Sequence, residues 1–342
     1  MKKNIFVLLT VALLLITGCG SKEKEHDTLP DESKEEVKKI NIIDMDSNTR
    51  PYAVVINNFP SAVKVQSGLQ EAYIVYEFPI EGGMTRSLAL YKDKEDVKIG
   101  TIRSARHDYL DYALENDAIF VHYGWSYTAR EDIAKLGINY IDGNSSDPSP
   151  FWRENPERLA TEHTVYTNLS KIIDYNTNTK GYRDTTDVKP SLKYTTEEVN
   201  LKDYDDAIIA GNIELSYSGA FKVSFSYNTE TAKYDRYVNG QAHTDYFTKE
   251  QYNCKNILVI LLDFGYVTDH ADAAGNNYLD LYNVGEGKGY YITNGYAKEI
   301  NWSKETRSSQ TRYTYLDGTE VDINDGNTYI MFESNSQGVK IN

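Results

Sequence analysis

Short apolar runs bounded by Pro, Gly and Asn recur through the first half of the chain. β-branched and aromatic residues dominate four of these runs, which is typical of strands, at 52–56, 72–78, 86–91 and 118–123. Elsewhere the apolar period lengthens to that of a helix, which predicts helices over 104–115, with Ser104 as N-cap, over 127–136, ended by Gly137, and over 169–175. Strands that alternate with helices predict a layered α/β domain over residues 51–185.

The second half of the chain has the period of strands almost throughout. We expect strands at 221–227, 234–238, 257–263, 278–284, 289–293, 311–316 and 328–333, with Asp-Gly hairpin turns at 317–318 and 325–326. The run 257–262 is wholly apolar, which favours a strand buried on both faces. Because residues 176–200 are rich in Asn, Thr, Asp and Lys, we place a domain boundary there and expect a smaller, β-rich C-terminal domain over 195–342. The predicted fold class is α/β, with α+β as the alternative.

The N-terminus has the pattern of a secretory signal peptide. Lys2 and Lys3 precede the apolar run 5–16, which is shorter than the roughly twenty residues that a membrane-spanning helix needs. The run ends in Ile16-Thr17-Gly18-Cys19, which resembles the bacterial lipobox. This resemblance implies cleavage after residue 18 and a diacylglycerol on Cys19; the alternative is an ordinary signal peptide with an incidental cysteine. Residues 19–50 are charged, without a sustained apolar period, and are interpreted as a tether.

Composition narrows the possible partners. The 342 residues include 36 Lys+Arg and 51 Asp+Glu, and the loss of Lys2 and Lys3 with the leader takes the formal net charge from -15 to -17. Such a chain repels phosphate backbones, so no nucleic-acid partner is expected. The other cysteine, Cys254, is expected to be a lone buried thiol rather than a nucleophile.

Arginine is concentrated in one stretch of this acidic chain. Six of the eleven Arg lie between Arg86 and Arg158, and Arg103 and Arg106 flank the expected start of a helix, whose free N–H groups attract anions. One interpretation is therefore an anion-binding site formed by Arg86, Arg103 and Arg106, together with nearby polar groups. The other is that Arg103 and Arg106 form structural ion pairs with Glu77 and Glu81.

Two histidines could add acid–base chemistry. His122 and His163, with Glu77 or Glu81, are the candidate catalytic residues, although a histidine beside aromatic residues is more often structural. Their spacing matches no metal motif, so no metal or cofactor is expected. Two further patterns are discounted, calcium binding by Asp269, His270 and Asp272, and a nucleotide loop at the glycines 285, 287 and 289, which we interpret as a hairpin turn.

Several motifs resemble those of the YerB family of bacterial lipoproteins. In the first half they are Arg50-Pro51-Tyr52-Ala53-Val54, Gln66-Ser67-Gly68-Leu69, Glu77, Glu81-Gly82-Gly83-Met84-Thr85-Arg86, Arg103-Ser104-Ala105-Arg106 and His122-Tyr123-Gly124. In the second half they are the stretch 285–295, Trp302-Ser303-Lys304 and Asp325-Gly326-Asn327-Thr328. The resemblance implies an N-terminal α/β domain, a smaller β-rich C-terminal domain and anchoring on the surface of Gram-positive bacteria. It implies no particular activity.

Three functional hypotheses follow. We favour a non-enzymatic lipoprotein, anchored by Cys19 to the outer face of the cytoplasmic membrane, that binds an anionic or polar envelope component such as a cell-wall polymer. The proposed ligand residues are Arg86, Arg103, Arg106, Glu77, Glu81 and His122. The alternatives are an envelope hydrolase or transferase that uses Glu and His, and an adaptor that binds an envelope protein through a tyrosine-rich β surface, since 20 of the 29 tyrosines follow residue 160.

Overall fold

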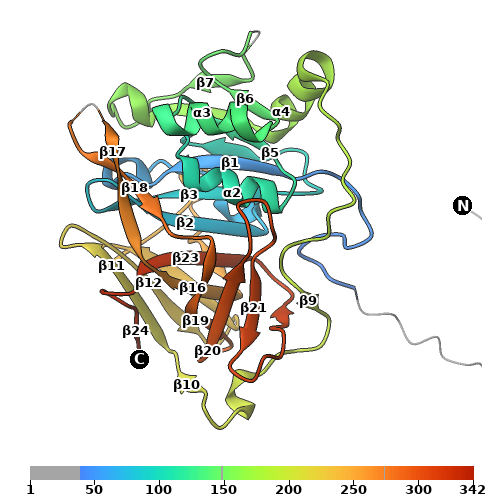
Figure 1. The fold of residues 1–342 in the computed structure, drawn as a ribbon, viewed down its shortest axis with the longest axis vertical. Helices are drawn as coiled ribbons and strands as arrows, with labels where there is room; N and C mark the ends of the chain where they lie inside the picture. Colours follow the sequence, from blue (N-terminus) through green and yellow to red (C-terminus); the bar gives the residue numbers. More distant parts are fainter. Residues whose placement is uncertain (1–38, 148, 273) are drawn as a thin grey trace, which may run out of the picture. The chain divides into compact units, whose positions relative to one another are not determined.

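A computed structural model describes residues 39–147, 149–272 and 274–342, which form one compact unit (Figure 1). The predicted signal peptide, Cys19 and the tether as far as residue 38 lie outside the described residues. Packing begins earlier than the expected end of the tether at residue 50. Ile43 is buried in the core, and the Asp325 carboxylate accepts hydrogen bonds from the backbone N–H groups of Asn41 and Ile42.

An eleven-stranded sheet runs through this unit and takes strands from both halves of the chain. The order is β10-β20-β19-β16-β23-β2-β3-β1-β5-β6, with β21 paired to β20. From the first half come β1 (Tyr52–Asn57), β2 (Ile74–Ile80), β3 (Met84–Tyr91), β5 (Ile119–His122) and β6 (Tyr140–Asp142). From the second come β10 (Ile208–Ile209), β16 (Asn256–Leu262), β19 (Gly285–Thr293), β20 (Tyr296–Lys304), β21 (Arg312–Tyr315) and β23 (Thr328–Ser334).

The halves meet where β2 pairs in parallel with β23, seen in Figure 1 as a blue strand beside a dark red one. Parallel neighbours on both sides of β23 leave it without an exposed edge, and its residues 328–333 are all buried. The α/β class with a mainly β C-terminal half is therefore confirmed. The boundaries 51–185 and 195–342 stay a prediction, because the sheet itself continues across the junction.

Helices cover one face of the first-half strands. α2 (His107–Glu115) and α3 (Tyr127–Leu136) pack Tyr109, Tyr112 and Ile133 against them, whereas α4 (Leu169–Tyr175) packs on the opposite face. The bounds predicted for α3 and α4 are confirmed. The predicted N-cap of α2 was wrong, because Arg106 holds that position and the Ser104 hydroxyl donates to the backbone carbonyl of Tyr123.

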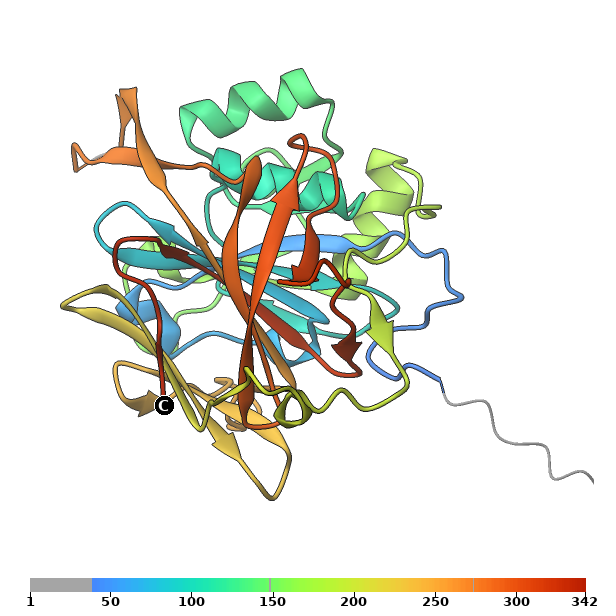
Figure 2. The same cartoon turned by 60° about the horizontal axis from the view of Figure 1, so that its bottom comes forward.

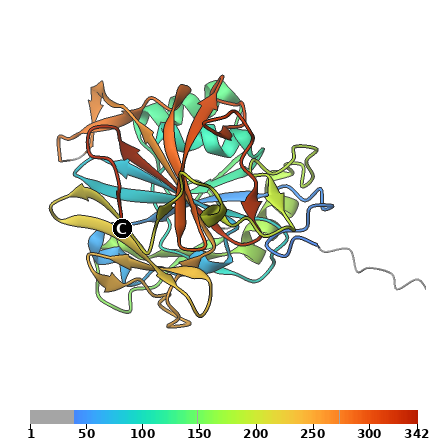
Figure 3. The same cartoon turned by 90° about the horizontal axis from the view of Figure 1, so that it is seen from below.

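The face that carries α4 is also covered by two smaller sheets. One is β4 (Lys98–Gly100), β8 (Val165–Asn168) and β7 (Phe151–Arg153). The other comprises β14 (Gln241–Ala242), β13 (Lys233–Val238), β12 (Phe221–Asn228), β11 (Asn212–Ser218), β24 (Lys340–Ile341) and β15 (Asn253–Cys254). Figures 2 and 3 show the yellow strands of the second small sheet, β11 to β15, on one side of the blue strands of the large sheet and the green helices α2 and α3 on the other.

The remaining elements are short. They are the β-pairs β17 (Phe264–Ala271) with β18 (Asn277–Leu281) and β9 (Tyr194–Thr195) with β22 (Ile323–Asn324), and the helical turns α1 (Pro60–Val63), η1 (Leu69–Glu71), η2 (Thr161–His163), η3 (Asn176–Lys180) and η4 (Leu201–Asp203). The expected turn at the glycines 285–289 was wrong, because β19 begins at Gly285 and pairs with β20 along its whole length. The strand needs a glycine at position 287, because the Trp302 ring lies against it and a Cβ atom there would clash with the ring.

Candidate functional site

The carboxyl ends of the parallel strands β1, β5 and β6 form one edge of the large sheet. β5 pairs in parallel with both of its neighbours, so the loops that follow these three strands emerge side by side. Asp142, at the end of β6, orders this edge by accepting from the backbone N–H groups of Gly124 and Asn144. Open α/β sheets bind ligands at such edges, so a ligand site is expected here.

A pocket of about 530 Å³ opens at this edge, and we call it the carboxyl-edge pocket. Its lining comprises Ile102, Arg103, Ser104, Tyr123, Gly124, Trp125, Asn144, Arg153, Thr161, Glu162 and Val165. Gly124 has a positive φ of 78°, and a Cβ atom there would lie 3.2 Å from the Ser104 hydroxyl and 3.1 Å from the Asn144 amide nitrogen. Glycine therefore lets the loops close around the pocket floor.

Arg103 is the predicted arginine that faces this pocket. It is half-buried, and within the described residues its guanidinium forms no hydrogen bond and no ion pair. Burial lowers the pKa of Arg103, the nearby Glu162 carboxylate opposes that effect, and Arg106 adds to it. Glu162 and Glu81 thus act on the positive charge of Arg103 from a distance, without a direct ion pair among the described residues.

Arg86 lies behind the loop that carries Arg103. It is 5% exposed, and its Nη1 donates to the carbonyl of Ser104 at 2.7 Å, while its Nε has no partner among the described residues. Burial, and then the charge of Arg106, lower the pKa of the Arg86 guanidinium to about 9, with Arg103 adding to this effect. Three arginines therefore gather beside the start of α2, where a single bound carboxylate neutralises only one of them.

That carboxylate is Glu81, which pairs with Arg106. The Arg106 Nη2 and Nε both donate to the Glu81 carboxylate, and the guanidinium lies 4.7 Å from the centre of the Tyr278 ring. Burial alone would raise the pKa of Glu81, but the hydrogen bond and charge of Arg106 outweigh it, and the pKa is lowered. Arg106 thus forms the structural ion pair of the second interpretation, whereas Arg103 does not.

Glu77 lies on the opposite face of the sheet from the three arginines. Alternation along β2 and β3 places Glu77 and Thr85 on the face of the small sheets and Phe78 and Arg86 on the face of α2. There the Glu77 carboxylate accepts from Arg236 at 2.8 Å, from Thr85 and from Asn58. Arg236 could not be predicted from the sequence, because nothing in the local sequence of β13 marks this arginine as buried, although it is only 1% exposed.

His122 lies on the α2 face but is sealed from solvent. It is 0% exposed and packed among the rings of Phe120, Trp125 and Tyr140, and its Nδ1 donates to the carbonyl of Gly124 at 2.8 Å. Burial lowers the pKa of His122 to about 4, against the opposing charge of Asp142. The sheet separates it from Glu77, so these two cannot act on one substrate.

His163 lies near the arginines, at the end of β1. Its Nδ1 accepts from the Asn57 side-chain amide at 2.8 Å, and its ring stacks on Phe59 with the centroids 4.9 Å apart. Burial lowers the pKa of His163, Glu162 opposes this effect, and the charges of Arg103 and Arg86 add to it. His163 is therefore held neutral and oriented beside the arginine cluster.

One group in the described residues has the ligand types of a metal site. His107, Asp108 and Asp280 have ligand atoms within 4.8 Å of one another, joining the start of α2 to β18. The His107 Nε2 lies 3.1 Å from Asp280 and 3.3 Å from Asp108, which is also the geometry of an ordinary ion-paired histidine. The sequence candidates at 269–272 lie elsewhere: Asp269 and His270 are in β17, and Asp272 accepts from Asn276 in the turn that follows.

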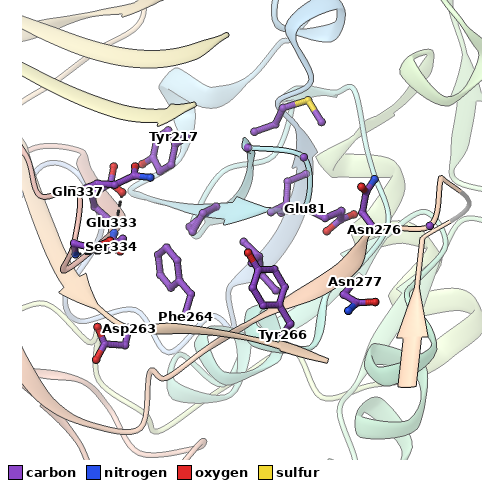
Figure 4. Close-up of a pocket in the computed structure, with 18 residues that line it drawn as sticks. Glu81, Tyr217, Asp263, Phe264, Tyr266, Asn276, Asn277, Glu333, Ser334 and Gln337 are labelled. Carbon is purple, nitrogen blue, oxygen red and sulfur yellow. Dashed lines mark hydrogen bonds between the residues drawn. The ribbon is translucent and has the colours of Figure 1, made fainter. Parts of the chain in front are cut away.

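A second cavity of about 770 Å³ lies where the two halves of the chain meet, and Figure 4 shows it. Glu81 is the only predicted site residue in its lining. The lining also contains Glu333, a buried carboxylate near the end of β23 that was not among the predicted site residues. The sequence does contain one signal for this residue. Glu333 is an acidic residue that directly follows the mostly apolar run 328–332, in which all residues are buried.

Comparison with known proteins places the chain in a family. The sequence profiles described as "Protein of unknown function (DUF3048) N-terminal domain" and its C-terminal counterpart match residues 41–183 and 213–330. The chain is 29% identical to "Putative lipoprotein YerB" of Bacillus subtilis (strain 168), over 89% of this chain and 88% of that protein. A crystal structure of the YerB protein from Bacillus subtilis superimposes with a TM-score of 0.72 at 28% identity, covering 86% of this chain and 94% of that one. The chain therefore belongs to the YerB family, whose two parts carry the DUF3048 N- and C-terminal domains.

Proposed function

We propose that this protein is a surface lipoprotein that binds an anionic cell-envelope polymer in the carboxyl-edge pocket. The observation that carries the proposal is Arg103, whose half-buried guanidinium faces the pocket without an ion pair or hydrogen bond among the described residues. A partly desolvated cation that makes no direct ion pair, even with the nearby Glu162, can bind an anion, because the interaction strengthens as water is excluded. Arg86 and Arg106 add positive potential from behind.

Neighbouring residues suggest which anion fits. Arg153 stacks over the Tyr123 ring at 5.1 Å, and Arg130 lies 5.7 Å from the Trp125 ring. Flat aromatic faces beside arginines suit a polymer that carries both sugar-like rings and phosphate or carboxylate groups. Arg103 is thus the residue that would contact the anion, Arg86 adds positive charge behind it, and Arg106 and Glu81 support the loop that carries Arg103.

The anchor belongs to the same proposal. The relative's name describes a lipoprotein, and the Cys19 motif has the corresponding pattern. Among the described residues, no helix is long and apolar enough to cross a membrane. Two or three acyl chains on Cys19 would hold the folded part at the outer face of the membrane, within reach of wall polymers.

The experiment compares two variants with the wild-type protein in a binding assay with a purified phosphate-containing wall polymer. Arg103→Ala should weaken binding about tenfold and leave the melting temperature unchanged, since its guanidinium has no hydrogen bond or ion pair within the described part of the chain. Arg312→Ala is the control. Arg312 is exposed on β21, and its substitution removes the same positive charge from a site outside the pocket. Equal binding by Arg103→Ala and Arg312→Ala would reject the pocket as the site. Added salt should weaken the wild-type interaction.

A further inference from the structure

The cavity of Figure 4 is acidic, in contrast to the carboxyl-edge pocket. We call it the hairpin cleft, because the β17–β18 hairpin forms one wall, the turn between β2 and β3 another, and the end of β23 the third. Its 18 lining residues are all among those described, and they include three carboxylates, Glu81, Asp263 and Glu333, and no lysine, arginine or histidine.

Glu333 is the carboxylate that the protein leaves without a cation. It is 1% exposed, its Oε1 accepts from the backbone N–H of Ser334 at 2.8 Å, and its Oε2 has no hydrogen-bond partner among the described residues. The other two carboxylates differ, because Glu81 pairs with Arg106 and Asp263 is exposed and accepts from Asn335. A buried carboxylate oxygen without a hydrogen-bond partner costs folding free energy.

A second unpartnered polar atom lies at the same end of the cleft. The Tyr217 hydroxyl is buried and makes no hydrogen bond among the described residues. In the view of Figure 4, Tyr217, Glu333 and Gln337 gather at one end, with Glu81 and Asn276 at the other. Both atoms would be satisfied by one ligand group that donates several hydrogen bonds.

We infer that the hairpin cleft binds a primary ammonium group on an aliphatic stem, as in a lysine side chain. An ammonium group has three donors and a positive charge, so it can bond to Glu333 and Tyr217 together and neutralise the carboxylate. Phe264, Met84 and Leu279 line the cleft and supply apolar surface for the methylene stem. The exposed Tyr266 ring offers a further face to a cation.

The wall of the cleft is shaped to hold such a ligand. Gly83, in the turn between β2 and β3, has a positive φ of 67°, and a Cβ atom there would lie 2.7 Å from the Ser218 Cβ. Glycine thus lets the turn pack against the end of β11, which brings Tyr217 beside Glu333. This site is separate from the carboxyl-edge pocket and prefers the opposite charge, so neither proposal depends on the other.

The test is a calorimetric titration of the full-length protein with N-acetyl-lysine amide, beside its norleucine analogue, which lacks the ammonium group. The lysine probe should bind and the norleucine probe should bind at least tenfold more weakly. Glu333→Gln keeps the shape of the side chain and removes the charge, and it should weaken lysine binding about tenfold or more. Glu230→Gln, which removes a charge from an exposed turn, should leave binding unchanged.

A second variant guards against misfolding of the first. Tyr217→Phe keeps the ring and removes only the hydroxyl, and it should weaken lysine binding severalfold. Equal affinity for the two probes, or lysine binding that survives both Glu333→Gln and Tyr217→Phe, would overturn the inference. So would a wild-type protein that shows no heat of binding at millimolar lysine probe.

Discussion

The Glu77 carboxylate and the Arg236 guanidinium meet at 2.8 Å inside the protein, with 0% and 1% of their side chains exposed. Glu77 belongs to β2 and Arg236 to β13, so this ion pair joins the first half of the chain to the small sheet of the second. Arg236 also donates through Nε to His243, and Glu77 accepts from Asn58 and Thr85. The two halves are therefore joined by a buried polar network as well as by the β2–β23 pairing.

Glu77→Ala should destabilise the protein by about 3–5 kcal/mol, because it leaves the Arg236 charge buried without a carboxylate. The control is Glu299→Ala, which breaks a pair of the same 2.8 Å length with Lys288, but on the surface with 42% and 54% of the side chains exposed. That change should cost less than about 1 kcal/mol. Urea denaturation measures both, and equal losses would show that the Glu77 pair does not hold the halves together.

Local elements could be predicted from the sequence because their signals are local. The apolar period and Gly137 gave the bounds of α3, and the run 257–262 gave a strand that is buried between two neighbours. The sequence could not reveal that β2 pairs with β23, or that Glu77 pairs with a residue 159 positions away. Those contacts depend on chain topology, which no short segment encodes.

Arg106→Ala and Arg103→Ala should differ in their effect on stability, although the two arginines are only three positions apart in the sequence. Loss of Arg106 removes two hydrogen bonds to the buried Glu81 carboxylate and should lower the free energy of unfolding by about 2–3 kcal/mol. Loss of Arg103, which has no such partner among the described residues, should lower it by less than about 0.5 kcal/mol. Thermal melts of both variants measure the difference, and a larger loss for Arg103→Ala would identify Arg103 as the structural residue.

The candidate site was only partly accessible to prediction. The motif around Arg103 marked a loop at the carboxyl edge of the sheet, and Arg86, Arg103 and Arg106 do gather there. Glu77 and Arg86 lie close in sequence on adjacent strands, yet they point to opposite faces, because side chains alternate and the pairing register decides which face each one takes. Register depends on partner strands, so the sequence alone could not exclude Glu77.

The His122 ring should remain neutral down to about pH 4. Burial among three aromatic rings holds its folded-state pKa well below that of an unfolded chain, so the unfolded state takes up the proton first. Stability is therefore lost as the pH falls from about 6.5 toward 4. NMR of the ring carbons measures the midpoint directly. A midpoint near 6.5 would mean that solvent reaches His122, and would restore it as an acid–base candidate.

Glu333 should make stability depend on pH in the opposite direction. Burial raises its pKa to about 7, from an ordinary 4.5, so the folded state keeps a proton that the unfolded state releases. The contribution is present below about pH 4.5 and is lost as the pH rises through 7, on the order of 2 kcal/mol in all. Tyr217, Asp263 and Glu81 also line this cleft, and none of them supplies a positive charge. Glu333→Gln should therefore become more stable relative to the wild type as the pH rises from 5 to 8, and urea denaturation measures both free energies of unfolding. A difference in free energy that does not change across this range would contradict a buried, unpaired carboxylate.

The two cysteines should behave as chemically separate groups. Burial raises the pKa of the Cys254 thiol, which is 0% exposed in β15, so the folded protein should not react there with a thiol reagent until it is denatured. Cys19, outside the described residues, is predicted to carry the lipid. Cys19→Ala should therefore abolish palmitate labelling and release the protein from the membrane fraction, whereas Cys254→Ser should leave both unchanged. Labelling that persists in Cys19→Ala would refute the anchor, and labelling lost in Cys254→Ser would show that the buried thiol is accessible before the chain folds.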